Sequence, residues 1–340
     1  MISEKVILAA KKCGDIFSNN KDVAKAEYRE LSRKYHPDIY KNDNGIMAKI
    51  NSLYEKAMYL IEIGEWEVSN QVILVEFSGK KSNHKFLSEN NFELGVFYIC
   101  DDEVIYILEA KHEKYYQNAI RKIQSLKYAN DGMKKEVSRF MPKIMYNYKL
   151  KDGRWCIAFY KTADMFLLDD LLNHFNGKIP PEHSAWIISR LNNICCYLDY
   201  IKVAHNGISL SNCFVSPEYH TIILLGGWWY CINQGEKMIG TQKAIYDIIP
   251  IKEKGMKIAT IITDLESSKL IGRQILGNLS LTSSKKEAAS YPKAIARFLR
   301  SGSSEKAVDE FRKWNDSLTE AFGKRKFIKL NINKNDIYKI

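Results

Sequence analysis

The chain of 340 residues is long enough for two domains at the usual ~150 residues each. Its 46% hydrophobic and 27% charged residues are typical of a globular protein and exclude a disordered or fibrous chain. Lysine and arginine exceed aspartate and glutamate by 51 to 40, which gives a net charge of +11. Because residues 1–70 hold eleven charges of each sign, the excess lies beyond residue 70 and favours an anionic partner there.

The seven cysteines predict neither a disulfide framework nor a zinc site, since their number is odd and no C-x-x-C pair occurs. This usage is typical of a reducing compartment. The apolar stretch near the start is too short for a secretory signal, and no apolar run approaches the roughly 18 residues of a membrane span. We therefore expect a cytoplasmic protein with no membrane partner and no metal.

Residues 1–68 form the first predicted domain, which is all helical. Apolar residues at spacings of three and four predict a helix over residues 22–36 with one buried face, made by Ala24, Tyr28, Leu31 and Tyr35. Another face carries a row of positive charges, here called the basic ridge: Lys21, Lys25, Arg29, Arg33 and the adjacent Lys34. Pro37 ends this helix, a polar loop follows at 41–44, and a second amphipathic helix begins near Met47.

Residues 28–38 (YRELSRKYHPD) and 47–55 (MAKINSLYE) resemble the second and third helices of the J domain of DnaJ-type co-chaperones. The string His36-Pro37-Asp38 is a weak motif alone, and its helical context makes it specific. The resemblance implies that this string and the basic ridge dock on a DnaK-type chaperone ATPase and stimulate its ATP hydrolysis. The simpler alternative is that Pro37 and Asp38 only end a helix and that the ridge is an ordinary solvated surface.

A change in sequence character near residue 70 marks a boundary between domains. We place a linker at 69–84 and a second domain at 85–340. In that domain, β-branched and aromatic residues predict a hairpin from the stretches 86–100 and 103–108. The other predicted elements are a helix at 117–128, strands at 144–150 and 155–160, and a long helix that begins after Pro180 and Pro181. This order, with strands first and then mainly helices, predicts an α+β domain.

The segment after the long helix resembles the catalytic loop of protein kinases. His205 and Asn212 have the spacing of that loop, and a strand-like run follows at 221–228. Asp264 resembles the aspartate of the large-lobe helix that braces the loop. The resemblance covers about residues 85–325 and is nearest to the kinase-like segments that follow a J domain in some bacterial and phage proteins. It implies a two-lobed protein-kinase-like fold.

The residues that carry out phosphoryl transfer are replaced at the matching positions. Gly207 stands in place of the catalytic-loop aspartate, and Gly226 in place of the magnesium-binding aspartate. Glu109 falls where the phosphate-binding lysine is expected, and Lys111 would serve only after a shift of two residues along one strand face. The stretch 86–100 has one glycine where a phosphate loop has three. We therefore expect a pseudokinase with no catalytic residue and no cofactor, which selects an unknown client protein.

Two alternative functions are also consistent with these residues. In the first, the second domain is a divergent kinase or a nucleotide-binding signalling protein that relies on Lys111 and another acid. In the second, the chain is a scaffold that binds RNA or an acidic protein, although no nucleic-acid motif points to RNA. His205 and Asn212 are expected to have structural roles. The aromatic run 228–230 is expected to be buried rather than to form a contact surface.

Overall fold

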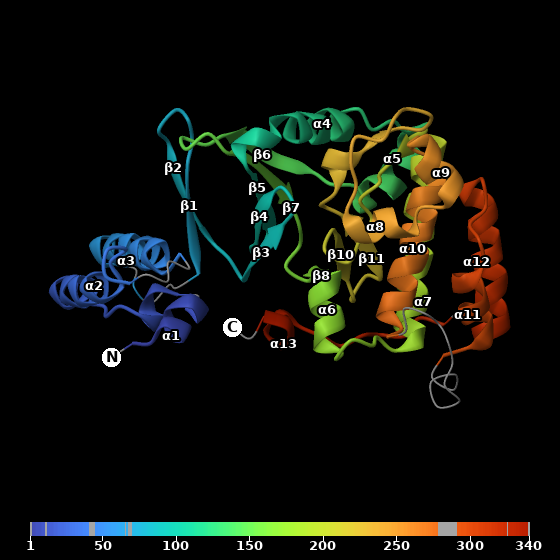
Figure 1. The fold of residues 1–340 in the computed structure, drawn as a ribbon. Helices are drawn as coiled ribbons and strands as arrows, with labels where there is room; N and C mark the ends of the chain where they lie inside the picture. The colour runs from blue at the N-terminus through green and yellow to red at the C-terminus, as the bar shows by residue number, and fades with distance from the viewer. Residues whose placement is uncertain are drawn as a thin grey trace. The chain divides into compact units, whose positions relative to one another are not determined.

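The structure is a computed structural model whose chain divides into two compact units. The first unit comprises Met1–Leu74 and Lys81–Phe86, and the second comprises Val75–Lys80 and Leu87–Ile340. Figure 1 colours the chain from blue at the start of the first unit to red at the end of the second. The described residues are 2–10, 12–40, 45–64, 66, 70–277, 291–324 and 326–338. The predicted polar loop at 41–44 lies outside them.

The first unit is built from helices. In chain order its elements are α1 (Glu4–Ala9), the 3-10 turn η1 (Cys13–Asp15), α2 (Lys21–Tyr35) and α3 (Ile46–Glu62). Asn20 starts α2, because its side-chain oxygen accepts hydrogen bonds from the backbone nitrogens of Asp22 and Val23. The helix begins and ends one residue before the predicted bounds.

The predicted apolar face of α2 is buried against α3. Tyr28 of that face is half-buried and stacks on Tyr54 of α3, with ring centroids 4.0 Å apart. The fully buried residues that the two helices contribute to the core of this unit are Ala24, Leu31, Tyr35, Ile46, Ile50, Leu53, Ala57 and Leu60. The two helices therefore form a hairpin held by one apolar seam.

The segment predicted as a linker, 69–84, holds a β-hairpin in place of irregular chain. Its strands are β1 (Gln71–Val75) and β2 (Lys81–Lys85), which pair as a two-stranded sheet. Residues 71–74 and 81–85 belong to the first unit, whereas Val75–Lys80, the tip, belongs to the second. The boundary between the units thus meets this hairpin twice, within β1 after Leu74 and just before β2, rather than at a single point in the chain.

A five-stranded antiparallel sheet begins the main part of the second unit, in the order β3-β4-β5-β7-β6. Its strands are β3 (Ser88–Phe92), β4 (Gly95–Ile99), β5 (Glu103–Leu108), β6 (Ile144–Lys149) and β7 (Trp155–Tyr160). The stretch 86–100, predicted as one arm of a hairpin, forms two strands because the chain turns at Glu93 and Leu94. Helix α4 (Glu113–Gln124) packs on the sheet, where Tyr116 stacks on Trp155 at 4.6 Å.

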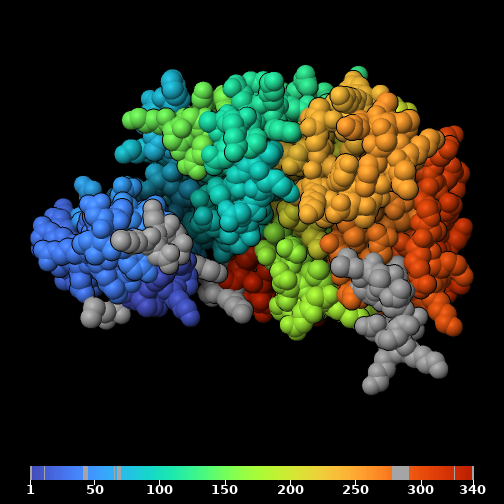
Figure 2. Space-filling view, viewed as in Figure 1, coloured from blue at the N-terminus to red at the C-terminus, as the bar shows by residue number. Residues whose placement is uncertain are grey.

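The rest of the second unit is mainly helical. The long helix α7 (Pro181–Tyr200) packs between α10 (Ile261–Ile275) and α12 (Ala307–Phe322), and Figure 2 shows α12, in red, at the surface beside the orange α10. The other helices are α5 (Asp131–Val137), α6 (Leu168–His174), α8 (Lys243–Ile248), α9 (Ile251–Met256), α11 (Lys293–Arg300) and α13 (Lys334–Tyr338). The short strands and 3-10 turns are β8 (Phe166–Leu167), β9 (Val203–Ala204), β10 (Cys213–Ser216), β11 (Thr221–Leu224), β12 (Ile232–Asn233), η2 (Ala110–His112), η3 (Ser138–Phe140) and η4 (Trp228–Tyr230).

One hydrophobic core joins the sheet to these helices. It includes Phe97 of β4, Leu191 of α7 and Trp314 of α12. A buried ion pair crosses it, since the amine of Lys269 lies 2.6 Å from the carboxylate of Glu310 and both side chains are 1% exposed. Each of these charges needs the other, because a lone charge in this place would be left without compensation. The second unit is therefore a mixed α+β structure with a single core, which confirms the predicted α+β class.

None of the described helices combines the length and the hydropathy that crossing a bilayer requires. Within the same residues, no group of three or more His, Cys, Asp or Glu side chains is arranged to hold a metal ion. The seven cysteines are free thiols, and six of them are buried.

Candidate functional site

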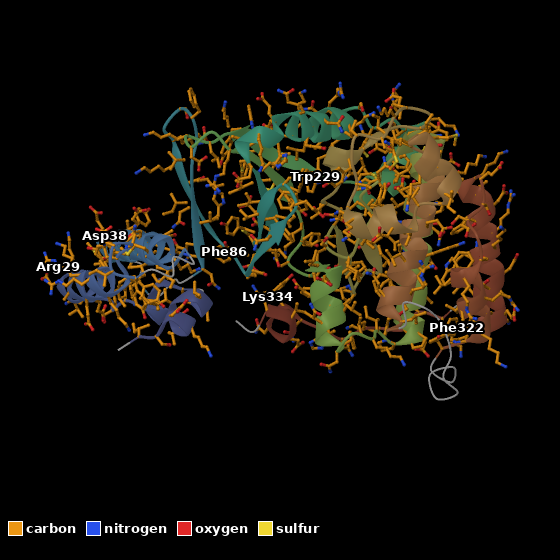
Figure 3. All side chains as sticks on the ribbon, in the orientation of Figure 1. Arg29, Asp38, Phe86, Trp229, Phe322 and Lys334 are labelled. Carbon is orange, nitrogen blue, oxygen red and sulfur yellow. The ribbon has the colours of Figure 1, made fainter. Side chains whose placement is uncertain are left out.

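The loop after α2 presents two polar side chains, those of His36 and Asp38, to solvent. His36 ends the helix, and its carbonyl oxygen accepts hydrogen bonds from the backbone nitrogens of Ile39 and Tyr40 at 2.9 and 2.8 Å. The Nδ1 atom of His36 lies 3.3 Å from the backbone nitrogen of Asp38 and 3.4 Å from its carboxylate. The two side chains are 50% and 87% exposed. Figure 3 labels Asp38 and Arg29 at the edge of the first unit. The loop is thus a compact turn whose polar groups remain free to meet a partner.

Two tyrosines fix the ends of this loop. Tyr35 is buried, and its hydroxyl donates a hydrogen bond to the carbonyl oxygen of Ile2 at 3.2 Å. Tyr40 donates to the carboxylate of Glu4 at 2.6 Å, and its ring meets that of Tyr35 edge to face at 5.1 Å. The hydrogen bond to Glu4 raises the pKa of the Tyr40 hydroxyl. Sequence reasoning missed Tyr40 and Glu4, because no local pattern links residues 36 positions apart.

The basic ridge follows α2 up to this loop. Lys21, Arg29, Arg33 and Lys34 are exposed, and Lys25 is half-buried. Arg29, Arg33 and Lys34 line a shallow hollow on the surface together with Ala26 and Glu30. The amine of Lys34 also donates to the carbonyl oxygen of Ile2 at 3.2 Å, so this residue helps to hold the N-terminal segment. The structure therefore brings the ridge and the His-Pro-Asp loop together on one helix and its end.

In the second unit, Asp264 holds the loop that contains His205. The two carboxylate oxygens of Asp264 accept hydrogen bonds from the backbone nitrogens of His205 and Asn206 at 2.7 and 2.8 Å. Asp264 lies in the first turn of α10 and has no exposed surface. Burial raises the pKa of its carboxyl to about 7, although the two backbone donors favour the charged form. A single side chain therefore ties α10 to the chain that follows β9.

His205 and Asn212 face inward within this loop. The ring of His205 packs edge to face on Trp228 at 4.8 Å and is fully buried, which lowers its pKa to about 3. The side-chain nitrogen of Asn212 donates to the carbonyl oxygen of Gly207 at 2.8 Å, and the backbone carbonyl oxygen of Asn212 accepts from the backbone nitrogens of Leu225 and Gly226. These contacts are those of loop scaffolding, and neither side chain reaches solvent.

Gly207 and Gly226 leave no room for a side chain. A Cβ at Gly226 would overlap the side-chain oxygen of Asn212 and lie 2.8 Å from the hydroxyl oxygen of Tyr106. A Cβ at Gly207 would lie 2.9 Å from the Cα of Gly227 and 3.0 Å from its carbonyl oxygen. Carboxylates at these positions would therefore force the backbone and the core to move.

Aromatic side chains fill the space between the sheet and the loop. Trp229 has no exposed surface, and its ring centroid lies 4.9 Å from that of Phe92 and 5.2 Å from that of Tyr106. Tyr106 stacks on Phe97 at 5.0 Å. Figure 3 labels Trp229 where the sheet meets the helices. As expected from the sequence, residues 228–230 are core, and they follow directly after Gly226 and Gly227.

The structure does not place Lys111 on a strand. Strand β5 ends at Leu108, Glu109 is exposed, and Lys111 lies exposed in the 3-10 turn η2 that follows. The proposed shift of two residues along one strand face is therefore wrong, because the strand has already ended. The inward face of β5 carries Val104, Tyr106 and Leu108, which all belong to the core. This face offers no cation to a phosphate.

Asn118 is a buried polar residue that sequence reasoning missed. It lies on α4, and its side-chain nitrogen donates to the carbonyl oxygens of Trp229 and Cys231 at 3.1 and 2.8 Å. Its side-chain oxygen accepts from the guanidinium of Arg121 at 2.9 Å. Asn118 therefore fixes the chain after Gly227 against α4. The only sign of this role in the sequence is that Asn118 stands among the apolar residues of an amphipathic helix.

Comparison with known proteins gives one kind of match. No protein-family model matches the chain, and no curated protein matches it in sequence. Among solved structures, the chain is similar to one described as vaccinia related kinase 3, with 13% sequence identity and a TM-score of 0.49. The match covers 73% of this chain and 90% of that one. At this identity and score the match carries no conclusion about activity.

Proposed function

We propose that this protein is a co-chaperone whose first unit docks on a DnaK-type ATPase and stimulates its ATP hydrolysis. The observation that carries the proposal is the exposed turn of His36, Pro37 and Asp38 at the end of a helix with a basic ridge. A J domain uses this combination to engage the chaperone, as the resemblance in sequence implies. The structural match is to a kinase and not to a co-chaperone. The support for this proposal therefore comes only from the sequence and geometry of the first unit.

The test is stimulation of ATP hydrolysis by a purified DnaK-type chaperone. The full chain should raise the hydrolysis rate, and His36→Gln and Asp38→Asn should each abolish that increase. His112→Gln, a half-buried histidine of the second unit, is the matched control and should stimulate as the parent does. Because the changed side chains in the loop are exposed, the two loop variants should also unfold at the parent's denaturant concentration. Undiminished stimulation by a folded His36→Gln protein would reject the proposed function.

We propose that the second unit is a kinase-like scaffold without phosphoryl-transfer activity. Two observations support this: a Cβ at Gly207 or Gly226 meets neighbouring atoms, and aromatic rings fill the adjacent space. Asp264 still braces the loop of His205, which is the support that such a scaffold requires. In this proposal the ATPase belongs to the chaperone, and the second unit selects the client.

One surface of the second unit suits an acidic client segment with apolar residues. Ile251 is 90% exposed on α9, and the side chains of Met256, on the same helix, and of Tyr246, on α8, are also exposed. Apolar groups so exposed are typical of contact surfaces. The amine of Lys254 lies over the ring of Tyr246 at 4.5 Å. Three more lysines of this segment are exposed, namely Lys243, Lys252 and Lys257.

A labelled acidic peptide that contains leucine is a suitable probe for this surface. Its fluorescence anisotropy should rise with added full chain, and Ile251→Asp should weaken binding by about tenfold, because it removes apolar contact and adds repulsion. Val308→Asp is the matched control, since Val308 is 45% exposed on α12. Equal binding by the two variants, or equal binding of a lysine-containing peptide, would reject this surface.

The second candidate function is that of a divergent kinase or nucleotide-binding protein. The observation that favours it is the kinase-like bracing of the His205 loop by Asp264. The test is incubation of the full chain with labelled ATP, magnesium and generic protein substrates, in comparison with Lys111→Met. Transfer of label that depends on Lys111 would promote this candidate, whereas absence of transfer and of ATP binding supports the scaffold.

A further inference from the structure

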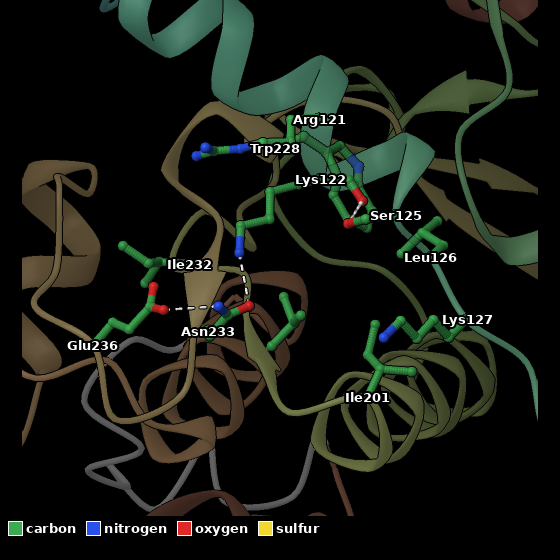
Figure 4. Close-up of a pocket in the computed structure, with 11 residues that line it drawn as sticks. Arg121, Lys122, Ser125, Leu126, Lys127, Ile201, Trp228, Ile232, Asn233 and Glu236 are labelled. Atoms are coloured by element: carbon green, nitrogen blue, oxygen red, sulfur yellow. Dashed lines mark hydrogen bonds between the residues drawn. The ribbon is translucent and has the colours of Figure 1, made fainter.

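A pocket in the second unit has a charged rim, and Trp228, on which His205 packs, forms part of its wall. Its volume is about 450 Å³, and it lies between the end of α4, the end of α7 and the short strands β9 and β12. Arg121, Lys122 and Lys127 line it, against one carboxylate, that of Glu236. Figure 4 shows Lys122 extending across the pocket to Asn233. Pockets of this size accept small organic molecules.

Lys122 is buried, whereas Arg121 and Lys127, the other two cations that line this pocket, are exposed. The amine of Lys122 donates one hydrogen bond, of 2.8 Å, to the side-chain oxygen of Asn233, and the side-chain nitrogen of Asn233 donates to Glu236. An ammonium group offers three N–H donors, and among the described residues the structure gives Lys122 no ion pair. Lys122 is 9% exposed, and burial lowers the pKa of its amine. A partly buried cation with unused donors gains from an anion that enters the pocket.

Apolar side chains form the rest of the wall. Leu126, Ile201, Trp228 and Ile232 line the pocket beside the cations. We infer that this pocket binds a small amphipathic anion, in which a ring or other apolar body carries a phosphate or carboxylate group that meets Lys122. This site is independent of the chaperone-binding loop, and its test does not depend on that function.

The first arm of the test uses phenyl phosphate as the probe, in calorimetric titration of the full chain. Binding should be saturable, and inorganic phosphate should bind about tenfold more weakly because it lacks the apolar body. Benzylamine has the same ring with a positive charge and should not bind. Equal binding of phenyl phosphate and benzylamine, or of phenyl phosphate and inorganic phosphate, would overturn the proposed ligand class.

The second arm changes the site. Lys122→Met keeps the apolar stem and removes the ammonium, so phenyl phosphate should bind about tenfold or more weakly. Lys114→Met is the matched control, because Lys114 is an exposed lysine of the same helix that does not line the pocket. If Lys122→Met does not fold, Ser125→Trp fills the pocket from an exposed position and should abolish binding. Parent-like affinity in a folded Lys122→Met or Ser125→Trp protein would overturn the proposal.

Discussion

The loop of His36 and the loop of His205 place the same side chain in opposite environments. His36 is half-exposed and lies beside an almost fully exposed carboxylate. His205 has no exposed surface, packs on Trp228, and keeps a neutral ring because burial lowers its pKa to about 3. The first loop offers polar groups to a partner, whereas the second offers none.

A sequence motif can indicate an exposed loop that meets a partner or a buried loop that supports the fold, and these two loops differ in this respect. In the first loop, hydrogen bonds from Tyr35 and Tyr40 hold the ends of the turn and leave its centre free. In the second loop, Asp264 and Asn212 bind the backbone itself. We therefore expect substitutions in the first loop to weaken binding of a partner at little cost in the free energy of unfolding. Substitutions around the second loop should lower the free energy of unfolding and should not change any phosphoryl transfer, because we expect none.

The largest effect is expected for Gly226→Asp. The new side chain would overlap Asn212 and crowd Tyr106 in a region without exposed surface, so the free energy of unfolding should fall by roughly 3–5 kcal/mol. Denaturant unfolding measures this loss, and labelled ATP checks that no transfer appears. Gly302→Asp, where nothing lies within 4 Å of an added Cβ, is the control and should stay within about 0.5 kcal/mol of the parent. Phosphoryl transfer by Gly226→Asp would contradict the scaffold.

Asp264→Ala should have the next largest effect. It leaves the backbone nitrogens of His205 and Asn206 without their acceptor in a buried place, at a cost of about 1–3 kcal/mol. Denaturant melts of the full chain provide the measurement. The exposed Asp316 of α12 supplies the control variant, Asp316→Ala, which should melt as the parent does. Identical melting of both variants would mean that the loop does not depend on Asp264.

A pH series sharpens the same comparison. Burial raises the pKa of Asp264 to about 7 in the folded chain, so the folded carboxyl binds its proton more tightly than the unfolded one. The contribution of this group to stability is therefore fully present below about pH 4 and is lost as the pH rises towards 7. Asp264→Asn cannot titrate, so its unfolding free energy should fall less over this interval. An equal fall in the two proteins would show that folding does not raise the pKa of Asp264.

The smallest effect on stability is expected for reversal of Arg29 and Arg33 to glutamate. Both side chains are exposed, so the unfolding free energy should change by no more than about 0.5 kcal/mol. Association with the chaperone should nevertheless slow by about tenfold at low salt, and added salt should mask most of the difference. Stopped-flow association rates at two ionic strengths test this. Reversal of the exposed Lys313 and Lys324 is the control, and a defect that persists in high salt would indicate lost packing.

The sequence predicts helix α2 more closely than it predicts helix α4, which begins and ends four residues before the predicted 117–128, or the boundary between the units. Helix α2 was predicted within one residue at each end, because its apolar period and Pro37 define a helix locally. Strand β7 has the predicted bounds. The hairpin of β1 and β2 was predicted as a linker, because β2 reads Lys-Ser-Asn-His-Lys and has no apolar alternation. Pairing with β1 forms this strand, and such pairing leaves no mark in the strand's own residues.

The candidate sites, too, could be predicted from the sequence only where the residues involved are close together in the chain. His36, Asp38 and the basic ridge follow from local spacing, and the structure places them together. The lack of space at Gly226 comes from Asn212 and Tyr106, residues 14 and 120 positions away, and no local pattern predicts that contact. Lys111 was predicted to lie on the same face of a strand as Glu109, but that strand ends three residues before Lys111. Asn118 and Lys122 act through partners more than 100 residues distant.

The hairpin of β1 and β2 has a consequence for any attempt to express the halves of the chain separately. A cut after Leu74 would take Lys81–Phe86 from the first unit, and a cut after Phe86 would take Val75–Lys80 from the second. No single break in the polypeptide returns both units with all their residues. The residues of the two units thus alternate along the gene. A fusion protein that contains only one of the units would have to include the whole hairpin.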